Sequence, residues 1–262
     1  ADHFFTGRPF PHGWVTTGAI AAATERVRIT TAFVNNLFRS PVEVAQASLM
    51  MQAVSGGRFE LGLGAGWMRS EMEGAGMRFP TPGERAGMFA ESAQIVRSIL
   101  HTGGCRFAGE HFTIEIEGLG PLTGSPPPLV ASVGGHRTVR EVTPHCDRVE
   151  IKASSASTRG GALDFGVMAT VTDDHLRDMI ARVRAVDPDI GIGMFVLCDA
   201  GTGSRTRQLE ELLGDSLYGR FYGAPEKLVE NMAWLGELGI SRCQISPHAD
   251  ATIDALAPLL FV

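Results

Sequence analysis

Cysteine is scarce in this sequence. The four cysteines lie about 40 to 50 positions apart and none forms a CxxC pair, which is typical of thiols in a reducing cytoplasm rather than of a disulfide framework or a zinc site. No apolar run approaches the roughly 18 residues that a membrane-spanning helix requires. With 23 Lys and Arg against 29 Asp and Glu, the net charge is −6, whereas nucleic-acid-binding proteins usually carry a basic stripe. We therefore expect a cytoplasmic protein that binds neither nucleic acid nor membranes.

Common catalytic motifs are also missing. No HExxH joins two of the eight histidines, no GK[ST] follows a glycine loop, and no GxSxG is present, which argues against zinc-protease, P-loop and hydrolase chemistry and predicts no metal site. What the sequence has in abundance is glycine, with 32 residues, and 44% hydrophobic residues against 20% charged ones. That composition supports a packed core, and the glycines mark places where the backbone turns sharply or comes close to something.

Two helix starts carry the capping-box pattern. Ser40 precedes Glu43 by three residues and Thr81 precedes Glu84 by three, and each cap is followed directly by proline. We expect each hydroxyl to accept the amide of the third helical residue, with the glutamate reaching back to the cap.

Strand-like and helix-like segments alternate along the chain. We expect strands over 26–34, 58–66, 129–133, 148–151, 190–198 and 242–246, helices over 40–55, 81–100, 136–145, 173–186, 225–238 and 251–260, a hairpin over 106–116, and loops over 154–161 and 201–203. Such alternation predicts a parallel sheet covered by helices. No linker divides the chain, so we expect one domain over 1–262. The length and the evenness of the repeat favour a (β/α)8 TIM barrel over a doubly wound sheet.

The glycine cluster over 62–66 is the most conspicuous motif. A GxGxxG fingerprint fails here, because its third glycine would fall at Trp67 or Arg69, and no helix is expected directly after it. Two interpretations stay open at this point. The glycines let a flat ligand approach the end of a strand, or they are small residues packed inside a narrow barrel.

Two further candidates follow from their surroundings. Gly134 and Gly135 end a strand and precede a helix start, where free backbone amides and Thr138 can face an anion, although an ordinary turn has the same pattern. His3 lies beside Asp2 at what reads as a strand end, and a lone histidine of this kind is either structural or catalytic.

Taken in order, six segments resemble the bacterial luciferase-like monooxygenase family, and in particular its deazaflavin (coenzyme F420)-dependent branch. They are ADHF (1–4), TERVRITTAFVNNLFRSPVEVAQ (24–46), SGGRFELGLGAGW (55–67), GERAGMFAES (83–92), PPLVASVGG (127–135) and YGAPEKLVENM (222–232). Each is weak alone, and the ordered set is specific. The resemblance implies a (β/α)8 barrel with a flavin or deazaflavin at the carboxyl ends of the strands.

The resemblance also implies roles for particular residues. His3 matches the histidine beside the reactive ring, where it would be a proton donor or base, or hold the substrate. The other matching positions bind the cofactor: Asp2 next to that histidine, Ala32 and Phe33 at a bulge behind the ring that often holds a non-proline cis peptide, Asn35 close by, Gly64, Ala65, Gly66 and Trp67 along the ring and ribityl chain, and Gly134, Gly135 and Thr138 at the phosphate.

Two departures from the family pattern affect the cofactor and the substrate. Ala65 stands where flavin enzymes of the family can place an arginine, which favours coenzyme F420 over FMN. Trp67 stands where sugar-phosphate dehydrogenases of the family place a catalytic glutamate, so sugar-phosphate oxidation is not expected. Together with Trp14, Phe5 and Met68, it indicates an apolar wall, which fits a hydrophobic substrate and core packing equally well.

We therefore expect an F420-dependent oxidoreductase that transfers a hydride to or from a small, apolar organic molecule. The alternatives are a two-component FMN monooxygenase supplied by a flavin reductase, and a flavin-binding barrel without catalysis. The family implies a homodimer.

In the family, ADHF ends the second barrel strand. The first strand, first helix and most of the second strand, about 30 to 40 residues, are then expected to precede residue 1, and an intact mass of 28.0 kDa would contradict this.

Overall fold

A computed structural model describes residues 2–5, 9–122 and 124–260. The chain divides into two compact units, 1–149 and 150–262. The single domain that the sequence suggests stays a prediction, and Ala1 of the ADHF segment lies outside the described residues.

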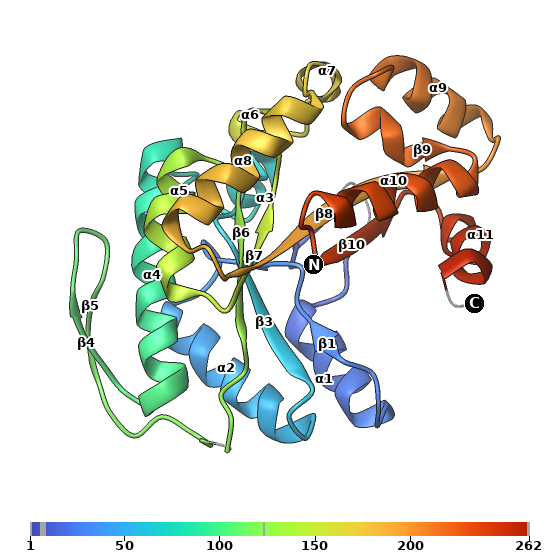
Figure 1. Ribbon diagram of the computed structural model, residues 1–262. Helices are drawn as coiled ribbons and strands as arrows, with labels where there is room; N and C mark the ends of the chain where they lie inside the picture. The colour runs from blue at the N-terminus through green and yellow to red at the C-terminus, as the bar shows by residue number, and fades with distance from the viewer. Residues whose placement is uncertain (1, 6–8, 123, 261–262) are drawn as a thin grey trace. The chain divides into compact units, whose positions relative to one another are not determined.

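The first unit contains a parallel sheet covered by helices (Figure 1). Its elements are α1 (Gly13–Ala23), β1 (Ile29–Thr30), β2 (Val34–Asn35), α2 (Pro41–Val54), β3 (Phe59–Gly64), α3 (Arg69–Gly74), α4 (Pro82–Thr102), β4 (Cys105–Ala108), β5 (Thr113–Ile116), β6 (Leu129–Val133), α5 (His136–Val142), a 3-10 turn η1 (Thr143–His145) and β7 (Arg148–Ile151), which continues into the second unit. The sheet order is β1-β3-β6-β7, with β2 also paired to β3, and β4 and β5 form a separate antiparallel hairpin.

The second unit is built around the long strand β8. Its elements are α6 (Ala156–Arg159), α7 (Phe165–Ala169), α8 (Asp173–Val186), β8 (Gly191–Ala200), α9 (Ser204–Leu213), a 3-10 turn η2 (Tyr218–Phe221), β9 (Tyr222–Gly223), α10 (Pro225–Glu237), β10 (Arg242–Pro247) and α11 (Ala251–Leu260). β8 pairs in parallel with β10 and β9.

Strand β3 forms the centre of the first unit, and all six of its residues are buried. Phe59, Leu61 and Leu63 point to one face and are almost completely shielded from solvent. The alternate residues Glu60, Gly62 and Gly64 point to the other face because successive side chains of a strand alternate. On that face Glu60 Oε2 accepts a hydrogen bond of 2.9 Å from Arg148 Nη2 in β7.

The strand expected over 26–34 is two short strands instead. β1 and β2 are separated by residues 31–33. There the hydroxyl of Thr31 donates to the carbonyl of Gly62 (3.0 Å) and accepts from its amide (2.9 Å). The Thr31 side chain thus takes the place of the hydrogen bonds that the backbone of a continuous strand would make to β3. The alternation of apolar and polar residues in the sequence could not reveal this break in the strand.

Only one of the two expected capping boxes forms. Thr81 and Glu84 exchange both bonds, which lower the pKa of the Glu84 carboxyl to about 2. Ser40 instead accepts the amide of Val42 at 3.2 Å. Glu43 does not reach back to this cap, because its carboxylate lies 3.6 Å from Nε of Arg39.

Several helices were not expected from the sequence. These are α1, α3, α7 and α9, together with α6 inside the expected loop over 154–161. Helix α1 buries only Ala21, and α9 buries only Thr206 and Leu213 and begins after Gly203, which provides no side-chain cap. Helices α1 and α9 therefore lack the usual signals in the sequence, whereas α7 does begin with a polar cap, Asp164, whose side chain accepts the amide of Val167.

All four cysteines are free, as the sequence indicated. Cys105 and Cys198 are buried, while Cys146 and Cys243 are partly exposed. Burial raises the pKa of Cys198 to about 12 and that of Cys243 to about 11, so both side chains are protonated thiols near neutral pH.

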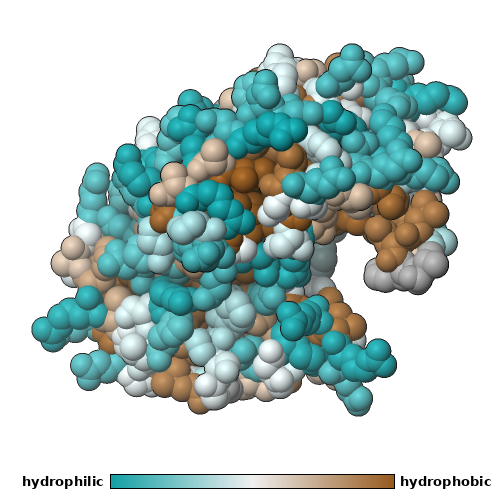
Figure 2. Space-filling view, in the orientation of Figure 1, coloured by the Kyte–Doolittle hydropathy of each residue, from teal (hydrophilic) through white to brown (hydrophobic). Residues whose placement is uncertain are grey.

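The surface is largely hydrophilic on the face seen in Figure 2, with apolar residues gathered in separate patches. No helix in the described part of the chain has the length and apolar character needed to cross a membrane. Within the described residues, no group of three or more His, Cys, Asp or Glu side chains is placed to hold a metal ion.

Arg58 joins the end of α1 to the end of α2. Its guanidinium donates to five oxygens, which are the carbonyls of Ser55, Ala21, Thr24 and Val27 and the hydroxyl of Thr24. We expect Arg58→Lys to lower the free energy of unfolding by about 2–4 kcal/mol, because an ammonium cannot satisfy this planar array. Urea unfolding measures this, with the exposed Arg26→Lys as the control. Equal stability of the two variants would contradict the prediction.

Candidate active site

His3 is held by a glutamate 68 residues further along the chain. Its Nδ1 lies 2.9 Å from Oε2 of Glu71, whose side chain is completely buried in α3. The other carboxylate oxygen, Oε1, accepts the backbone amide of Phe4. One carboxylate therefore fixes both the backbone and the ring of the His3 segment.

Aromatic rings enclose the rest of the imidazole. Phe10 and Trp67 meet the His3 ring edge-on, with centroid distances of 5.4 Å and 6.0 Å. The His3 side chain is 16% exposed, and its Nε2 has no partner among the described residues. This nitrogen is thus available for proton transfer inside an apolar surrounding.

Asp2 uses its carboxylate within the protein. Oδ2 accepts the amide of Asn35 at 3.1 Å and also binds Nη1 of Arg39. The Asn35 side chain in turn accepts the amide of Leu37 at 3.0 Å. These bonds tie the N-terminal segment to the end of β2, and contact of Asp2 or Asn35 with a cofactor stays a prediction.

The peptide bond between Ala32 and Phe33 is cis, as the family resemblance implies. This bulge packs directly against β3. A Cβ atom at Gly64 would lie 3.1 Å from Cβ of Phe33, and one at Gly62 would lie 1.9 Å from the carbonyl oxygen of Thr31. The first two glycines of the cluster are therefore explained by packing against the bulge, one of the two interpretations left open by the sequence.

Gly66 is required for a different reason. Its φ is +75°, a conformation that other residues rarely adopt, and a Cβ there would meet Oδ1 of Asn35 at 2.4 Å. Ala65 and Trp67 on either side are partly exposed. The glycine lets this loop lie close to the end of β2.

The Gly134–Gly135 turn is closed by a hydroxyl. Oγ1 of Thr138 accepts the amides of Gly134 (3.4 Å) and Gly135 (3.2 Å) and donates to the carbonyl of Gly135 (3.0 Å). The two amides that the sequence offered to an anion thus converge on one point at the start of α5. An anion there would compete with the Thr138 hydroxyl for them.

Two buried polar groups flank Gly64 without a hydrogen-bond partner in the described structure. The side-chain amide nitrogen of Asn36 is one and the hydroxyl of Ser132 is the other. The backbone amide of Asn36 donates to the carbonyl of Gly64 (3.0 Å), which places Asn36 beside the end of β3. Ser132 follows Ala131, the register partner of Leu63, on the neighbouring strand β6. Both atoms are shielded from solvent by the protein itself, so each is a buried polar group without a partner inside the sheet end.

The structure thus brings together His3 and Trp67, and it links Asp2 to Asn35 and Phe33 to Gly64. Among the described residues, no hydrogen bond or ring contact joins Gly134, Gly135 or Thr138 to His3. Sequence reasoning missed Glu71, Arg39 and Thr31. Glu71 lies in a short helix beside Met72, and nothing in its local pattern distinguishes it from the exposed Glu73 two residues later.

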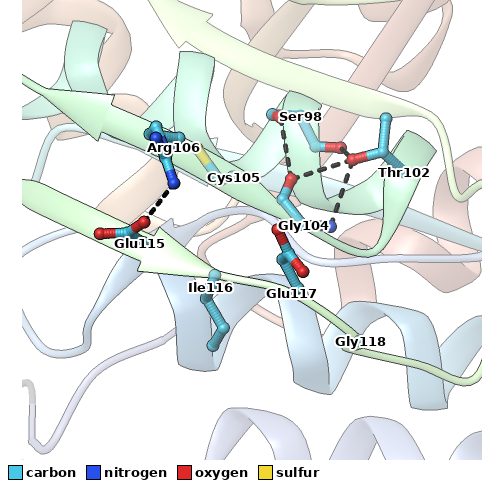
Figure 3. A pocket seen from close by; sticks show the side chains of 9 residues that line it. All are labelled: Ser98, Thr102, Gly104, Cys105, Arg106, Glu115, Ile116, Glu117 and Gly118. Atoms are coloured by element: carbon cyan, nitrogen blue, oxygen red, sulfur yellow. Dashed lines mark hydrogen bonds and ion pairs between the residues drawn. The ribbon is translucent and has the colours of Figure 1, made fainter.

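A cavity at the end of α4 is a separate feature. A space of about 480 Å³ opens at the end of α4 and is lined by Ser98, Thr102, Gly104, Cys105, Arg106, Glu115, Ile116, Glu117 and Gly118 (Figure 3). The hydrogen bonds and ion pairs drawn as dashed lines in Figure 3 join lining residues to one another, and they include the Arg106–Glu115 ion pair. None of the lining residues is a partner of His3.

Comparison with known proteins identifies the family. The sequence model of the luciferase-like monooxygenase family matches residues 1–240. The chain belongs to this family. The resemblance seen in the sequence is thereby confirmed.

Solved structures confirm the barrel fold. An F420-dependent secondary alcohol dehydrogenase, solved with an F420–acetone adduct, matches with a TM-score of 0.75 and 18% identity, covering 99% of this chain and 87% of that one. A monooxygenase, RslO1 from Streptomyces bottropensis, matches with a TM-score of 0.73 and 17% identity, covering 99% and 85%. The (β/α)8 fold expected from the sequence is therefore correct.

Among curated proteins, an F420-dependent glucose-6-phosphate dehydrogenase of Amycolatopsis mediterranei is 29% identical over 142 residues, which is 52% of this chain and 42% of that protein. A second curated relative is covered over 58% of its length. The chain spans about half the length of the curated relatives it matches.

Proposed function

We propose that this chain is an oxidoreductase that binds coenzyme F420 and transfers a hydride between the deazaflavin and a small, apolar organic molecule. The observation that carries the proposal is the position of His3. A fully buried carboxylate holds its Nδ1, its Nε2 has no hydrogen-bond partner among the described residues, and Phe10 and Trp67 meet its ring edge-on.

The residues present suit a flat heteroaromatic ring that carries a phosphate. Gly64 keeps the end of β3 free of side chains beside the Phe33 bulge, and the amides of Gly134 and Gly135 converge on one point, a donor pair that suits a phosphate. His3, Trp67 and the 64–66 loop would hold the ring, and the Gly134 turn with Thr138 would hold the phosphate. Deazaflavin supplies hydride transfer at its ring when it is bound.

The protein's own contribution is proton transfer and exclusion of water. His3 would accept the O–H or N–H proton of the substrate at Nε2 during oxidation and would return it in the reverse direction. Phe10 and Trp67 form an apolar wall beside the His3 ring, which favours an apolar substrate over a sugar phosphate.

Ligand titration tests the cofactor. We expect F420 to bind more tightly than FMN, as followed by cofactor fluorescence, because Ala65 leaves no cation at the position where FMN enzymes of the family can place one. Riboflavin is the control, because it lacks the phosphate that the Gly134 turn would bind. Tight FMN binding without F420 binding would contradict the proposal.

A two-component FMN monooxygenase is the second candidate. It is favoured by the likeness in fold to monooxygenase RslO1, and it would need a flavin reductase as partner. Oxygen consumption with reduced FMN distinguishes it from the F420 enzyme. For either function we propose a homodimer, as in the family resemblance, which the mass in solution would test.

A further inference from the structure

The carboxylate of Glu71 has two different partners, and together they determine where the His3 ring carries its proton. Oε1 accepts the amide of Phe4, a donor that cannot change its role. Oε2 faces Nδ1 of His3 at 2.9 Å. A carboxylate is only an acceptor, so Nδ1 must be the nitrogen that bears hydrogen.

We infer that Glu71 is a positioning residue that keeps neutral His3 in the Nδ1–H tautomer and so leaves the lone pair at Nε2; this inference rests on the proposed function only for its catalytic consequence. With the lone pair at Nε2, the substrate O–H or N–H bond can break toward this nitrogen. The electron pair of that O–H or N–H bond becomes the second bond of the C=O or C=N product, and the C–H pair would leave as hydride to the deazaflavin of the proposed function.

The same geometry makes an isosteric substitution informative. In Glu71→Gln the amide oxygen must occupy the Oε1 position, because the Phe4 N–H requires an acceptor there. The NH2 group then faces Nδ1 of His3 and forces that nitrogen to accept. The ring proton moves to Nε2, so this nitrogen of His3 changes from a general base into a hydrogen-bond donor, while the size and shape of residue 71 stay the same. Protonated His3 would also oppose the NH2 group at Nδ1, so proton return in the reverse direction suffers as well.

Nitrogen-15 NMR of the histidine rings tests this without cofactor or substrate. We expect the neutral His3 ring to carry its proton at Nδ1 in the wild type and at Nε2 in Glu71→Gln. The His3 signals are those that disappear in His3→Asn. The matched control is Glu73→Gln, an exposed residue of the same helix, which should leave the tautomer unchanged.

Turnover gives the second readout. Glu71→Gln should lower kcat by about 10²-fold or more with cofactor affinity retained, because a wrong tautomer in a related carboxylate–histidine pair costs about 10⁴-fold. An Nε2–H ring in the wild type, or the same tautomer in wild type and Glu71→Gln, would overturn the inference. If Glu71→Gln does not fold, the tautomer seen in the wild-type spectrum is sufficient to test the inference. Failure of F420 to bind would reject the proposed function and leave the tautomer result standing.

Discussion

Replacement of His3 by alanine should lower turnover by about 10²- to 10⁴-fold, the usual contribution of a general acid–base group. The substitution removes the only nitrogen that we assign to proton transfer. The cofactor should still bind, because the glycine loop, the Phe33 bulge and the Gly134 turn do not depend on the imidazole. Steady-state kinetics and a cofactor titration on the same preparation measure both quantities.

His101→Ala is the matched control for this experiment. His101 lies exposed in the last turn of α4 and is not among the partners of His3, so its loss should leave turnover unchanged. If His3→Ala bound cofactor normally and retained full turnover, His3 would be structural. Absence of turnover in the wild type as well, with cofactor bound, would favour a flavin-binding barrel without catalysis.

Gly62→Ala should be among the most destabilising small substitutions in the first unit. The new Cβ would lie 1.9 Å from the carbonyl oxygen of Thr31, which belongs to the backbone and cannot rotate away. The shift would also stretch both bonds between the Thr31 hydroxyl and the Gly62 backbone. We expect the free energy of unfolding to fall by about 3 kcal/mol, at the upper end for overpacked sites.

Gly83→Ala provides the comparison in a urea-unfolding experiment. No atom lies within 4 Å of a Cβ built at Gly83, and alanine is favoured over glycine in helices such as α4. This variant should be as stable as the wild type or slightly more stable. Equal unfolding of Gly62→Ala and Gly83→Ala would show that the 31–33 bulge adjusts easily, and that the glycine at position 62 is not needed for packing.

The elements with strong local signals could be predicted from the sequence. Thr81, Pro82 and Glu84 carry their own cap, and the helix they begin is present with both capping bonds. The same pattern at Ser40 failed, because Arg39, outside the box, competes for Glu43. A capping box is therefore reliable only when no neighbouring charge draws its glutamate away.

In the candidate site, too, some residues could be proposed from the sequence and others could be identified only from the structure. His3, the 62–66 glycines and the Gly134 turn could be proposed as site residues because their residue types are unusual and their order matches a family. Glu71 was missed because only packing distinguishes it from Glu73. In the structure one carboxylate is completely buried on His3 and the other is exposed beside Arg69.

The sequence by itself determined the family, the alternation of strands and helices, and the barrel that follows from them, since periodicity, caps and turn residues act between near neighbours. The tertiary structure alone decided that 31–33 leaves the ladder, that Gly62 and Gly64 pack against that bulge, and that Asp2 pairs with Arg39. It also decided which nitrogen of His3 faces Glu71. These contacts join residues that are 31 to 68 positions apart. They depend on buried atoms meeting in three dimensions, which no local pattern records.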